Sequence, residues 1–219
     1  VRENLLVGYG LVVGLNGTGD SLNNAPFTEE SLVSMLERLG VNTRGINLST
    51  DNVAAVMVTA TLPPFARQGD EIDVQVSSLA DAEDLLGGTL VVTPLLGADG
   101  EVYAVAQGPV ATAAIVAQGD AASIVRGVPT SGRVPGGAIV EREVEFELNE
   151  MTQMTLSLRN PDFTTALRIA QVINARLNSA AAFAKDPSSV VLTVPEQYAG
   201  DLVSLMADVE NLRVSPDQI

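Results

Sequence analysis

The feature that most constrains this fold is a series of short segments with strand-like apolar patterns. Residues 72–76 alternate apolar and polar side chains, which predicts a strand with one buried and one solvent-facing side. Residues 53–62 are almost continuously apolar and end at two prolines. Two further strands are predicted at 89–94 and 102–107, joined by the hairpin turn Ala98-Asp99-Gly100. The chain is therefore expected to contain an antiparallel sheet.

The stretch before these strands combines glycine-broken apolar pieces with one clear helical pattern. Glycine is too dense across residues 1–27 for a helix, so short strands with tight turns are predicted. From about residue 28 to residue 40 the apolar residues recur with the spacing of a helix, for which Thr28 is the predicted N-cap and Gly40 the predicted end. The predicted buried face consists of Leu32, Met35, Leu36 and Leu39. This single helix would cover the sheet.

A change in composition follows the sheet. Gly, Ala, Ser and Pro are frequent across residues 108–137, which predicts a long, mobile connection. Residues 143–148 then alternate apolar side chains with glutamates, as a strand with one acidic side would. We therefore predict a β-rich first domain over residues 1–150.

Residues 151–219 are predicted to form a separate, small module. A strand at 154–158 leads into Asn160-Pro161-Asp162, which are predicted to be the N-cap, a first-turn proline and a first-turn acid of a helix. A second strand at 190–194 is followed by a second helix. The order strand–helix–strand–helix beside an antiparallel β-rich domain makes the predicted fold class α+β.

Two residue types that carry much of enzyme chemistry are missing, because the sequence has no histidine and no cysteine. The chain therefore has no Ser-His-Asp triad, no thiolate nucleophile and no ordinary structural zinc site. Apolar residues make up 46% of the chain but aromatic residues only 4%, so the core must consist of Val, Leu, Ile and Ala. The sequence predicts no catalytic, cofactor-binding or metal-binding residue and no cofactor.

The charge balance limits the possible partners. The chain carries 27 acidic and 12 basic residues, for a net charge of −15. Such a surface repels phosphate backbones and anionic membranes, so no nucleic-acid partner is expected. No apolar run approaches the length of a membrane span, and no membrane insertion is expected. Because the chain begins at Val1 rather than Met, we expect that a leader or a longer N-terminus has been removed.

The glycines near the start have a functional and a structural interpretation. Gly8, Gly10 and Gly14 are spaced somewhat like a dinucleotide-binding turn, which needs a helix directly after it. The glycines at residues 16–19 are too close together for that helix to follow. Tight turns between strands are the favoured interpretation.

The acidic runs and the aromatic stripes also allow alternatives. Acidic residues at 70–73, 81–84 and 141–147 could bind a cation or form a catalytic carboxylate pair, but solvated surface is favoured. The helical stripes that contain Phe163 and Tyr198 are interpreted as core packing.

Arg67 follows the stiff segment Pro63-Pro64-Phe65-Ala66, in which the aromatic residue is expected to be exposed. An arginine beside an exposed aromatic is a frequent anchor of protein interfaces. The alternative is an ordinary salt bridge within the loop, and both interpretations remain open.

Six stretches combine residues in an order far more specific than any short motif. The first contains Val1-Arg2-Glu3-Asn4 and Gly8-Tyr9-Gly10-Leu11-Val12-Val13-Gly14-Leu15-Asn16-Gly17-Thr18-Gly19-Asp20, and the others are residues 52–60, 63–69, 87–90, 102–108 and 137–143. Together they resemble the family of flagellar P-ring proteins of the bacterial basal body. The resemblance covers residues 1 to about 145 strongly and the remainder in pattern.

The resemblance implies a periplasmic subunit, secreted through a cleaved signal peptide, that assembles with copies of itself into a closed ring. The ring would surround the flagellar rod at the peptidoglycan layer, beneath the L-ring protein, and act as a passive bushing without catalysis. A periplasmic chaperone would assist its assembly. The module at 151–219 would be of a ring-building type, and a C-terminal part of the longer family chain is expected to be absent from this sequence.

The same resemblance implies partner contacts at Asp51, Glu83 and Leu96. Many family members carry lysine at the first two positions and a basic residue at the third, where contacts to the rod or the neighbouring ring are made. Here two are acidic and one is apolar. With Arg67 these form the predicted partner interface. A hydrated gap between like-charged surfaces would suit a bearing of low adhesion.

Two functions of other classes remain as alternatives. One is a peptidoglycan-binding periplasmic module that does not form a ring. The other is a carboxylate enzyme, which would need paired acids of raised pKa in a cleft.

Overall fold

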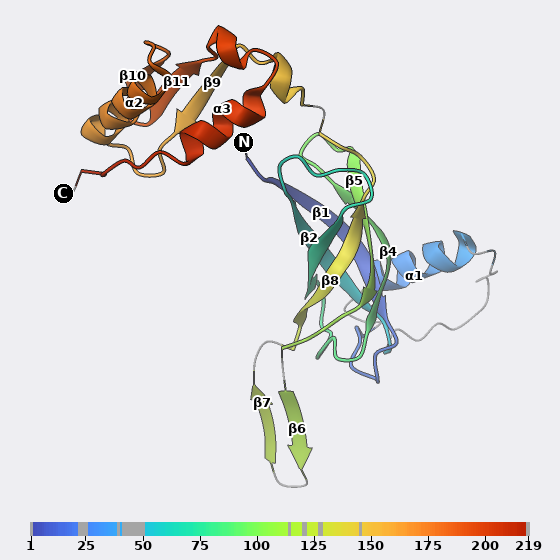
Figure 1. Ribbon diagram of the computed structural model, residues 1–219. Coiled ribbons are helices and arrows are strands. Elements are labelled where there is room, and N and C mark those ends of the chain that lie inside the picture. Colours follow the sequence, from blue (N-terminus) through green and yellow to red (C-terminus); the bar gives the residue numbers. More distant parts are fainter. Residues whose placement is uncertain are drawn as a thin grey trace. The chain divides into compact units, whose positions relative to one another are not determined.

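The computed structural model describes residues 2–21, 26–38, 40, 51–113, 115–119, 122–126, 129–144 and 146–217. For residues 115–119 and 122–126 it describes the backbone only. The chain divides into two compact units, Val1–Val144 and Glu145–Ile219, which contain antiparallel sheets and helices of an α+β fold (Figure 1).

The first unit is a closed, antiparallel β-barrel. Its strands, in the order in which they pair around the barrel, are β1 (Asn4–Val13), β2 (Ala54–Leu62), β3 (Glu71–Ser78), β8 (Ser131–Val140), β5 (Val102–Pro109) and β4 (Thr89–Leu96). The predicted antiparallel strands and the hairpin between β4 and β5 are confirmed. Closure by pairing of β4 with β1 goes beyond the predicted sheet and removes its edges.

The barrel interior is filled by small aliphatic side chains. Fully buried residues from the strands include Leu6, Val56, Val58, Val74, Val76, Leu90, Leu95, Ala104, Ala106 and Ala138. A barrel with so few strands has an interior only wide enough for side chains. A core of Val, Leu, Ile and Ala, as the composition predicts, suits that narrow space.

Residues 4–13 of the glycine-rich start form one continuous strand rather than short strands with turns, and the predicted turns lie only after it, where Gly14 and Gly17 have positive φ. A Cβ atom on Gly8 would lie 2.3 Å from the carbonyl oxygen of Pro94, and one on Gly10 would lie 2.3 Å from Oγ1 of Thr93. These glycines therefore serve close packing of β1 against β4 rather than a change of chain direction.

Helix α1 (Pro26–Arg38) lies on the outside of the barrel (Figure 1). It buries Leu32 against Leu11, Val53 and Ala55. The predicted helix is confirmed, but it begins earlier, so Thr28 lies inside it and does not cap it. Of the predicted buried face, Met35 and Leu36 are half-buried and pack against the same cluster as Leu32. Leu39 lies outside the described residues.

The prediction of one long connection over 108–137 is wrong for much of its length. Strand β8 includes residues 131–137, and β6 (Ile115–Gly119) pairs with β7 (Ala122–Arg126) in a two-stranded hairpin. The pairing of β8 with β3 jumps from Ala138 opposite Ile72 to Val134 opposite Val74. Pro135, Gly136 and Gly137 thus form a bulge within a strand, which the sequence pattern did not distinguish from a loop.

The acidic strand predicted at 143–148 is also not formed. The described residues between β8 and the short 3-10 helix η1 (Leu148–Glu150) belong to no strand. Alternation of apolar and polar residues favours a strand only where a neighbouring strand supplies hydrogen bonds, and among the described residues none pairs with this segment.

The second unit packs two helices on a three-stranded antiparallel sheet (Figure 1). In chain order its elements are β9 (Gln153–Ser157), α2 (Phe163–Leu177), β10 (Ala182–Asp186), β11 (Ser189–Thr193), η2 (Glu196–Tyr198) and α3 (Leu202–Glu210). Strand β10 was not predicted, because residues 182–186 have no β-branched side chain. The predicted helix is confirmed but begins two residues later than predicted: Asp162 rather than Asn160 is its N-cap, since the side chain of Asp162 accepts a hydrogen bond from the backbone N–H of Thr165.

Core packing was predicted correctly for one aromatic residue of this unit and wrongly for the other. Tyr198 packs against the core of the second unit. Phe163 is 75% exposed, and Leu167 one turn later is also exposed. Helix α2 buries only the narrower stripe Ala166, Ala170, Ile173 and Leu177.

A polar cluster joins the two helices of the second unit. The Tyr198 hydroxyl donates a hydrogen bond of 2.5 Å to Asp208, and Arg176 forms an ion pair of 2.8 Å with the same carboxylate. The Tyr198 hydrogen bond, with a smaller contribution from Arg176, lowers the pKa of Asp208 below its ordinary value. Asp208 therefore stabilises the fold above its unfolded-state pKa, and this contribution is lost as the pH falls through its lower folded-state pKa.

Replacing Tyr198 with phenylalanine is expected to weaken the acid dependence of stability. The variant loses the main cause of the lowered Asp208 pKa, so its stability should fall less steeply below about pH 4. Thermal unfolding of wild type and variant between pH 3 and pH 7 measures this difference. Tyr9→Phe, which alters an exposed tyrosine of the first unit, is the control. An unchanged acid dependence in Tyr198→Phe would contradict the prediction.

Candidate assembly surfaces

A buried carboxylate organises one end of the barrel. Asp20 is fully buried, and its Oδ2 accepts hydrogen bonds from the Thr28 hydroxyl (2.6 Å) and the Ala55 backbone N–H (2.7 Å). Its Oδ1 accepts from the Ala82 backbone N–H (3.0 Å). One side chain thereby connects α1, β2 and the segment before β4. The sequence analysis missed this role, because the partners of Asp20 are distant in sequence.

The structure brings Asp51 and Glu83 to opposite sides of the turn that precedes Asp20. The Gly19 N–H donates to the Asp51 carbonyl oxygen (2.7 Å), and the Glu83 N–H donates to the Thr18 carbonyl oxygen (2.8 Å). Both side chains are exposed. Asp81 and Asp84 lie beside them and accept hydrogen bonds from Ser21 and Thr18, respectively. We call Asp51, Asp81, Glu83 and Asp84 the acidic end of the barrel.

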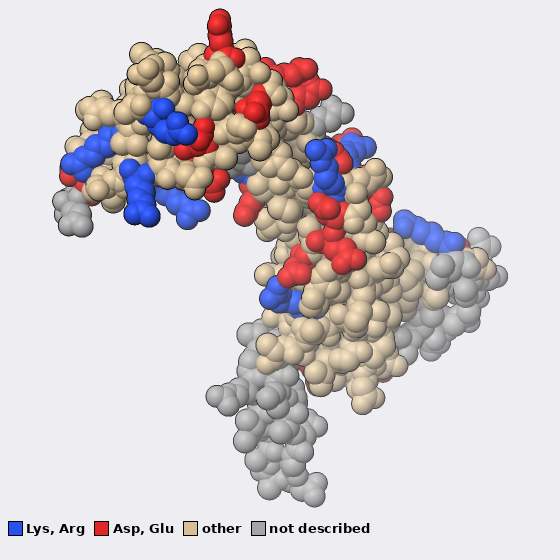
Figure 2. Space-filling view, in the orientation of Figure 1, with Lys and Arg blue, Asp and Glu red and all other residues tan. Residues whose placement is uncertain are grey.

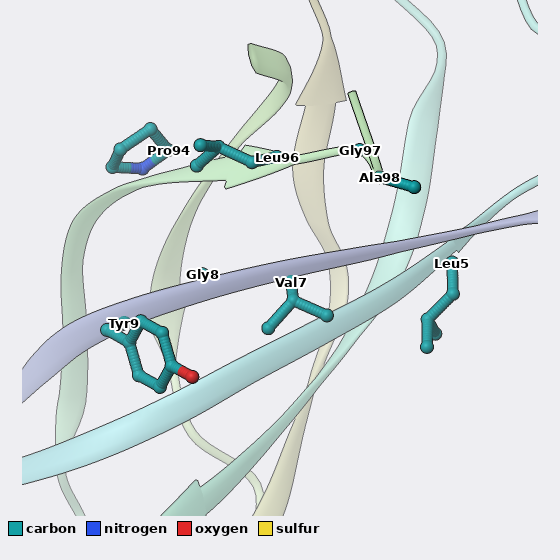
Figure 3. A pocket seen from close by; sticks show the side chains of 8 residues that line it. All are labelled: Leu5, Val7, Gly8, Tyr9, Pro94, Leu96, Gly97 and Ala98. Carbon is teal, nitrogen blue, oxygen red and sulfur yellow. The ribbon is translucent and has the colours of Figure 1, made fainter. Parts of the chain in front are cut away.

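An apolar groove lies at the other end, between β1 and β4. It has a volume of about 580 Å³ and is lined by Leu5, Val7, Gly8, Tyr9, Pro94, Leu96, Gly97 and Ala98. Figure 3 shows the β1 side chains Val7 and Tyr9 on one side of it and Pro94 and Leu96 of β4 on the other. We call these eight residues the seam groove.

The seam groove exists because the ladder between β1 and β4 is irregular. Val7 pairs with Leu96 and Val12 with Leu90, so β4 contains one residue more than β1 between these pairs. Pro94 lies in this interval and has no N–H to donate to a neighbouring strand. The backbones come close at Gly8, whereas the side chains of the two strands diverge on the outer surface.

A second hollow shares one wall with the seam groove. It measures about 390 Å³ and is lined by Tyr9, Pro26, Phe27, Thr28, Ala55, Leu79 and Ala80. Tyr9 belongs to both hollows and is 61% exposed. An apolar surface therefore continues from the seam groove to the start of α1.

Arg67 lies in the loop of residues 63–69 between β2 and β3. Its Nη1 atom forms an ion pair of 3.0 Å with Oε2 of Glu143, and the Gln68 N–H donates to the same carboxylate (3.1 Å). The Gln68 hydrogen bond and then Arg67 lower the pKa of Glu143. Arg67 thus forms a salt bridge in this structure, with a residue outside its loop. Its role at an interface stays a prediction.

The four predicted interface residues form two separate groups. Asp51 and Glu83 lie at the acidic end, where β1 ends and β2 and β4 begin. Leu96 lines the seam groove, and the loop of Arg67 follows the end of β2, opposite the start of β1. The sequence analysis did not identify Leu5, Tyr9 or the groove around Leu96.

Charged side chains on the surface are arranged in pairs and acidic clusters. Figure 2 shows acidic side chains with few basic ones among them over the barrel, where Arg133 pairs with Asp73 and Arg142 with Glu101. Within the described ranges, no group of three or more acidic residues is placed to bind a metal ion. Among the helices of the described residues, none is long and apolar enough to cross a membrane.

An acidic barrel with exposed apolar hollows has the features of proteins that work through contact with other macromolecules. Sequence comparison identifies the family: over residues 1–219 the chain belongs to the flagellar P-ring proteins. The family resemblance found in the sequence is thereby confirmed.

Individual relatives are similar along the whole chain. The flagellar P-ring proteins of Rhodopseudomonas palustris (strain TIE-1), Paramagnetospirillum magneticum and Rhodospirillum rubrum are 60%, 60% and 61% identical to it over 218, 226 and 219 residues. Each match covers 100% of this chain and 58% of the relative. The chain thus spans less than two thirds of the length of these proteins.

Proposed function

We propose that this chain is part of a structural subunit of the flagellar P ring, a closed periplasmic ring around the rod at the peptidoglycan layer. The observation that carries the proposal is identity of about 60% to flagellar P-ring proteins over the full chain. The subunit arrives in the periplasm through a signal peptide that is cleaved. Its role is mechanical and involves no catalytic step.

The proposal assigns partners to the two units. Copies of the chain contact one another around the ring, and the small unit contributes to these contacts as a ring-building module. The acidic end faces the rod, while the L-ring protein and peptidoglycan contact the ring from outside. A periplasmic chaperone assists assembly. The separation of the acidic end from the seam groove supports a subunit that meets different partners at different ends.

Deletion of the gene in the parent bacterium tests this function. We expect basal bodies purified from the deletion strain to lack the P ring, swimming to be lost, and the full-length gene to restore both. A P ring that remains intact in the deletion strain would contradict the proposal. A protein that binds purified peptidoglycan but is absent from purified basal bodies would support the alternative of a wall-binding module.

Reversing the charge of Asp51 and Glu83 is expected to impair swimming. The double variant Asp51→Lys, Glu83→Lys would convert a like-charged gap into an attractive contact if the rod surface is acidic, and an attractive contact adds friction. Swimming speed and ring yield in the parent bacterium are the measurements. Glu3→Lys, Glu71→Lys, which makes the same charge change at the other end of the barrel, is the control. Unchanged swimming would leave the acidic end without a role toward the rod.

A further inference from the structure

The turn before Asp20 contains the one Asn-Gly sequence of the chain, Asn16-Gly17. We propose that Asn16 is a modification site, at which the side-chain amide is lost spontaneously, and that the side chain of Asn52 controls the rate of this loss. The product is aspartate or isoaspartate, and either one places a new carboxylate beside the acidic end of the barrel. The inference goes beyond the proposed ring function and does not depend on it.

The reaction needs only water and the chain itself. The backbone nitrogen of Gly17 loses its proton to solvent and attacks Cγ of Asn16. The side-chain nitrogen leaves as ammonia, with a proton taken from water, and a five-membered succinimide ring remains. Water then adds to one of the two ring carbonyl carbons and opens the ring. Opening at Cγ gives aspartate, whereas opening at the backbone carbonyl gives isoaspartate, in which the backbone is one carbon longer.

The surroundings of Asn16 and Gly17 favour this attack. Both residues are exposed, so water reaches them. Within the described part of the chain the Asn16 side chain forms no hydrogen bond, so its amide is free to turn toward the backbone. Gly17 has a φ of 74°, and a Cβ built on it would meet no atom within 4 Å. Neither a side chain on Gly17 nor a neighbouring segment therefore shields the attacking nitrogen.

One hydrogen bond restrains the reaction. The Gly17 N–H donates to Oδ1 of Asn52 (3.0 Å), so the nitrogen that must lose its proton holds that proton toward an acceptor. The Leu15 N–H donates to the backbone carbonyl of the same Asn52 (3.1 Å), which keeps the two segments aligned. This bond must break before the Gly17 nitrogen can attack, and breaking it costs free energy. Asn52 therefore slows the loss of the Asn16 amide in the folded chain.

A second asparagine followed by a small residue is less favourably placed. Asn178 is the C-cap of α2, and the Ser179 N–H donates to the backbone carbonyl of Asn174 (3.2 Å) in the turn that ends this helix. Unlike Gly17, Ser179 also carries a Cβ that obstructs approach of its nitrogen to the side-chain amide. We therefore expect Asn16 to react before Asn178.

The modification would change both the charge and the length of the turn. Residues 15–20 are hydrogen-bonded to the backbone of Asp51, Asn52 and Glu83. A new carboxylate at position 16 strengthens the negative field of the acidic end. Isoaspartate also adds one carbon to a backbone segment that is fixed on both sides, which distorts these hydrogen bonds. The isoaspartate form should therefore unfold at a lower urea concentration than the Asn16→Asp variant, which has the same charge and a normal backbone.

Mass analysis of proteolytic peptides from the purified chain, incubated folded at neutral to mildly alkaline pH, measures the reaction. We expect the mass gain that accompanies replacement of an amide by a carboxylate to appear first at Asn16, with an isoaspartate form that separates by chromatography. Asn16→Gln should abolish the gain in this peptide, because glutamine would have to close a six-membered ring. Asn52→Ala should raise the rate about two- to tenfold, the change that one hydrogen bond accounts for.

Two controls separate the hydrogen bond from a general loosening of the turn. Asn52→Asp keeps an acceptor oxygen of the same shape and should react no faster than wild type. In urea, where the bond is absent, wild type and Asn52→Ala should react at the same rate. A folded wild-type chain in which Asn178 reacts before Asn16 would overturn the inference, and so would equal rates in folded wild type and folded Asn52→Ala.

Discussion

Replacing Asp20 with alanine is expected to lower the free energy of unfolding of the barrel by about 3–5 kcal/mol, since three buried donors lose their acceptor together. The Thr28 hydroxyl and the N–H groups of Ala55 and Ala82 bind this one carboxylate. Because Asp20 is fully buried, water cannot easily replace it. The loss should also release the start of α1, which Thr28 holds against the barrel.

Urea unfolding of the purified chain measures this effect. Asp20→Asn retains one acceptor oxygen but turns an amide toward a donor, so it should fall between wild type and Asp20→Ala. Glu3→Ala, at an exposed position, is the control and should remain within about 0.5 kcal/mol of wild type. An Asp20→Ala chain as stable as the control would show that the carboxylate does not organise this end of the barrel.

Gly8→Ala is expected to destabilise the barrel by about 1–3 kcal/mol and to act at the seam between β1 and β4. The added Cβ would lie 2.3 Å from the Pro94 carbonyl oxygen and 2.9 Å from Cδ2 of Leu95. Since the nearer atom belongs to the backbone, relief requires the two strands to separate. Leu96 would move with β4, so the shape of the seam groove should change as well.

Amide hydrogen exchange together with urea unfolding tests this prediction. Exchange should accelerate in β1 and β4, while β3 and β8, which pair on another side of the barrel, keep their protection. Gly14→Ala is the control, because its Cβ would meet no atom and only its left-handed backbone is strained, at a cost of about 1 kcal/mol. Equal effects of the two substitutions, without faster exchange in β4, would contradict close packing at Gly8.

Local patterns were sufficient to predict the elements that depend on local sequence. The alternation at 72–76, the turn at 98–100 and the apolar period of α1 each identified the correct type of element. Closure of the barrel could not be predicted in this way, because the pairing of β1 with β4 joins residues far apart in sequence. The sequence did not predict the bulge at 135–137 or strand β10 for a different reason. Their local composition is atypical of strands, although both belong to strands in the fold.

The candidate surfaces were harder to predict from the sequence than the strands and helices, because they depend more on tertiary structure. Asp51 and Glu83 come from separate segments and lie at the same end of the barrel only because the backbone of each is hydrogen-bonded to the turn at Thr18 and Gly19. Leu96 was identified by resemblance, but its groove arises from the irregular pairing around Pro94, which no spacing of residues indicates. Exposure of Phe65 was expected from its prolines, whereas its left-handed backbone became apparent only in the fold.

We propose that surfaces within these 219 residues close a ring. The most direct test is the mass of the purified chain in solution across concentration and salt, with negative-stain imaging of any large species. We predict concentration-dependent oligomers that appear as arcs or closed rings, favoured by higher salt because salt screens repulsion between acidic copies. A strict monomer under all these conditions would contradict the claim and would place the closing contacts outside this chain.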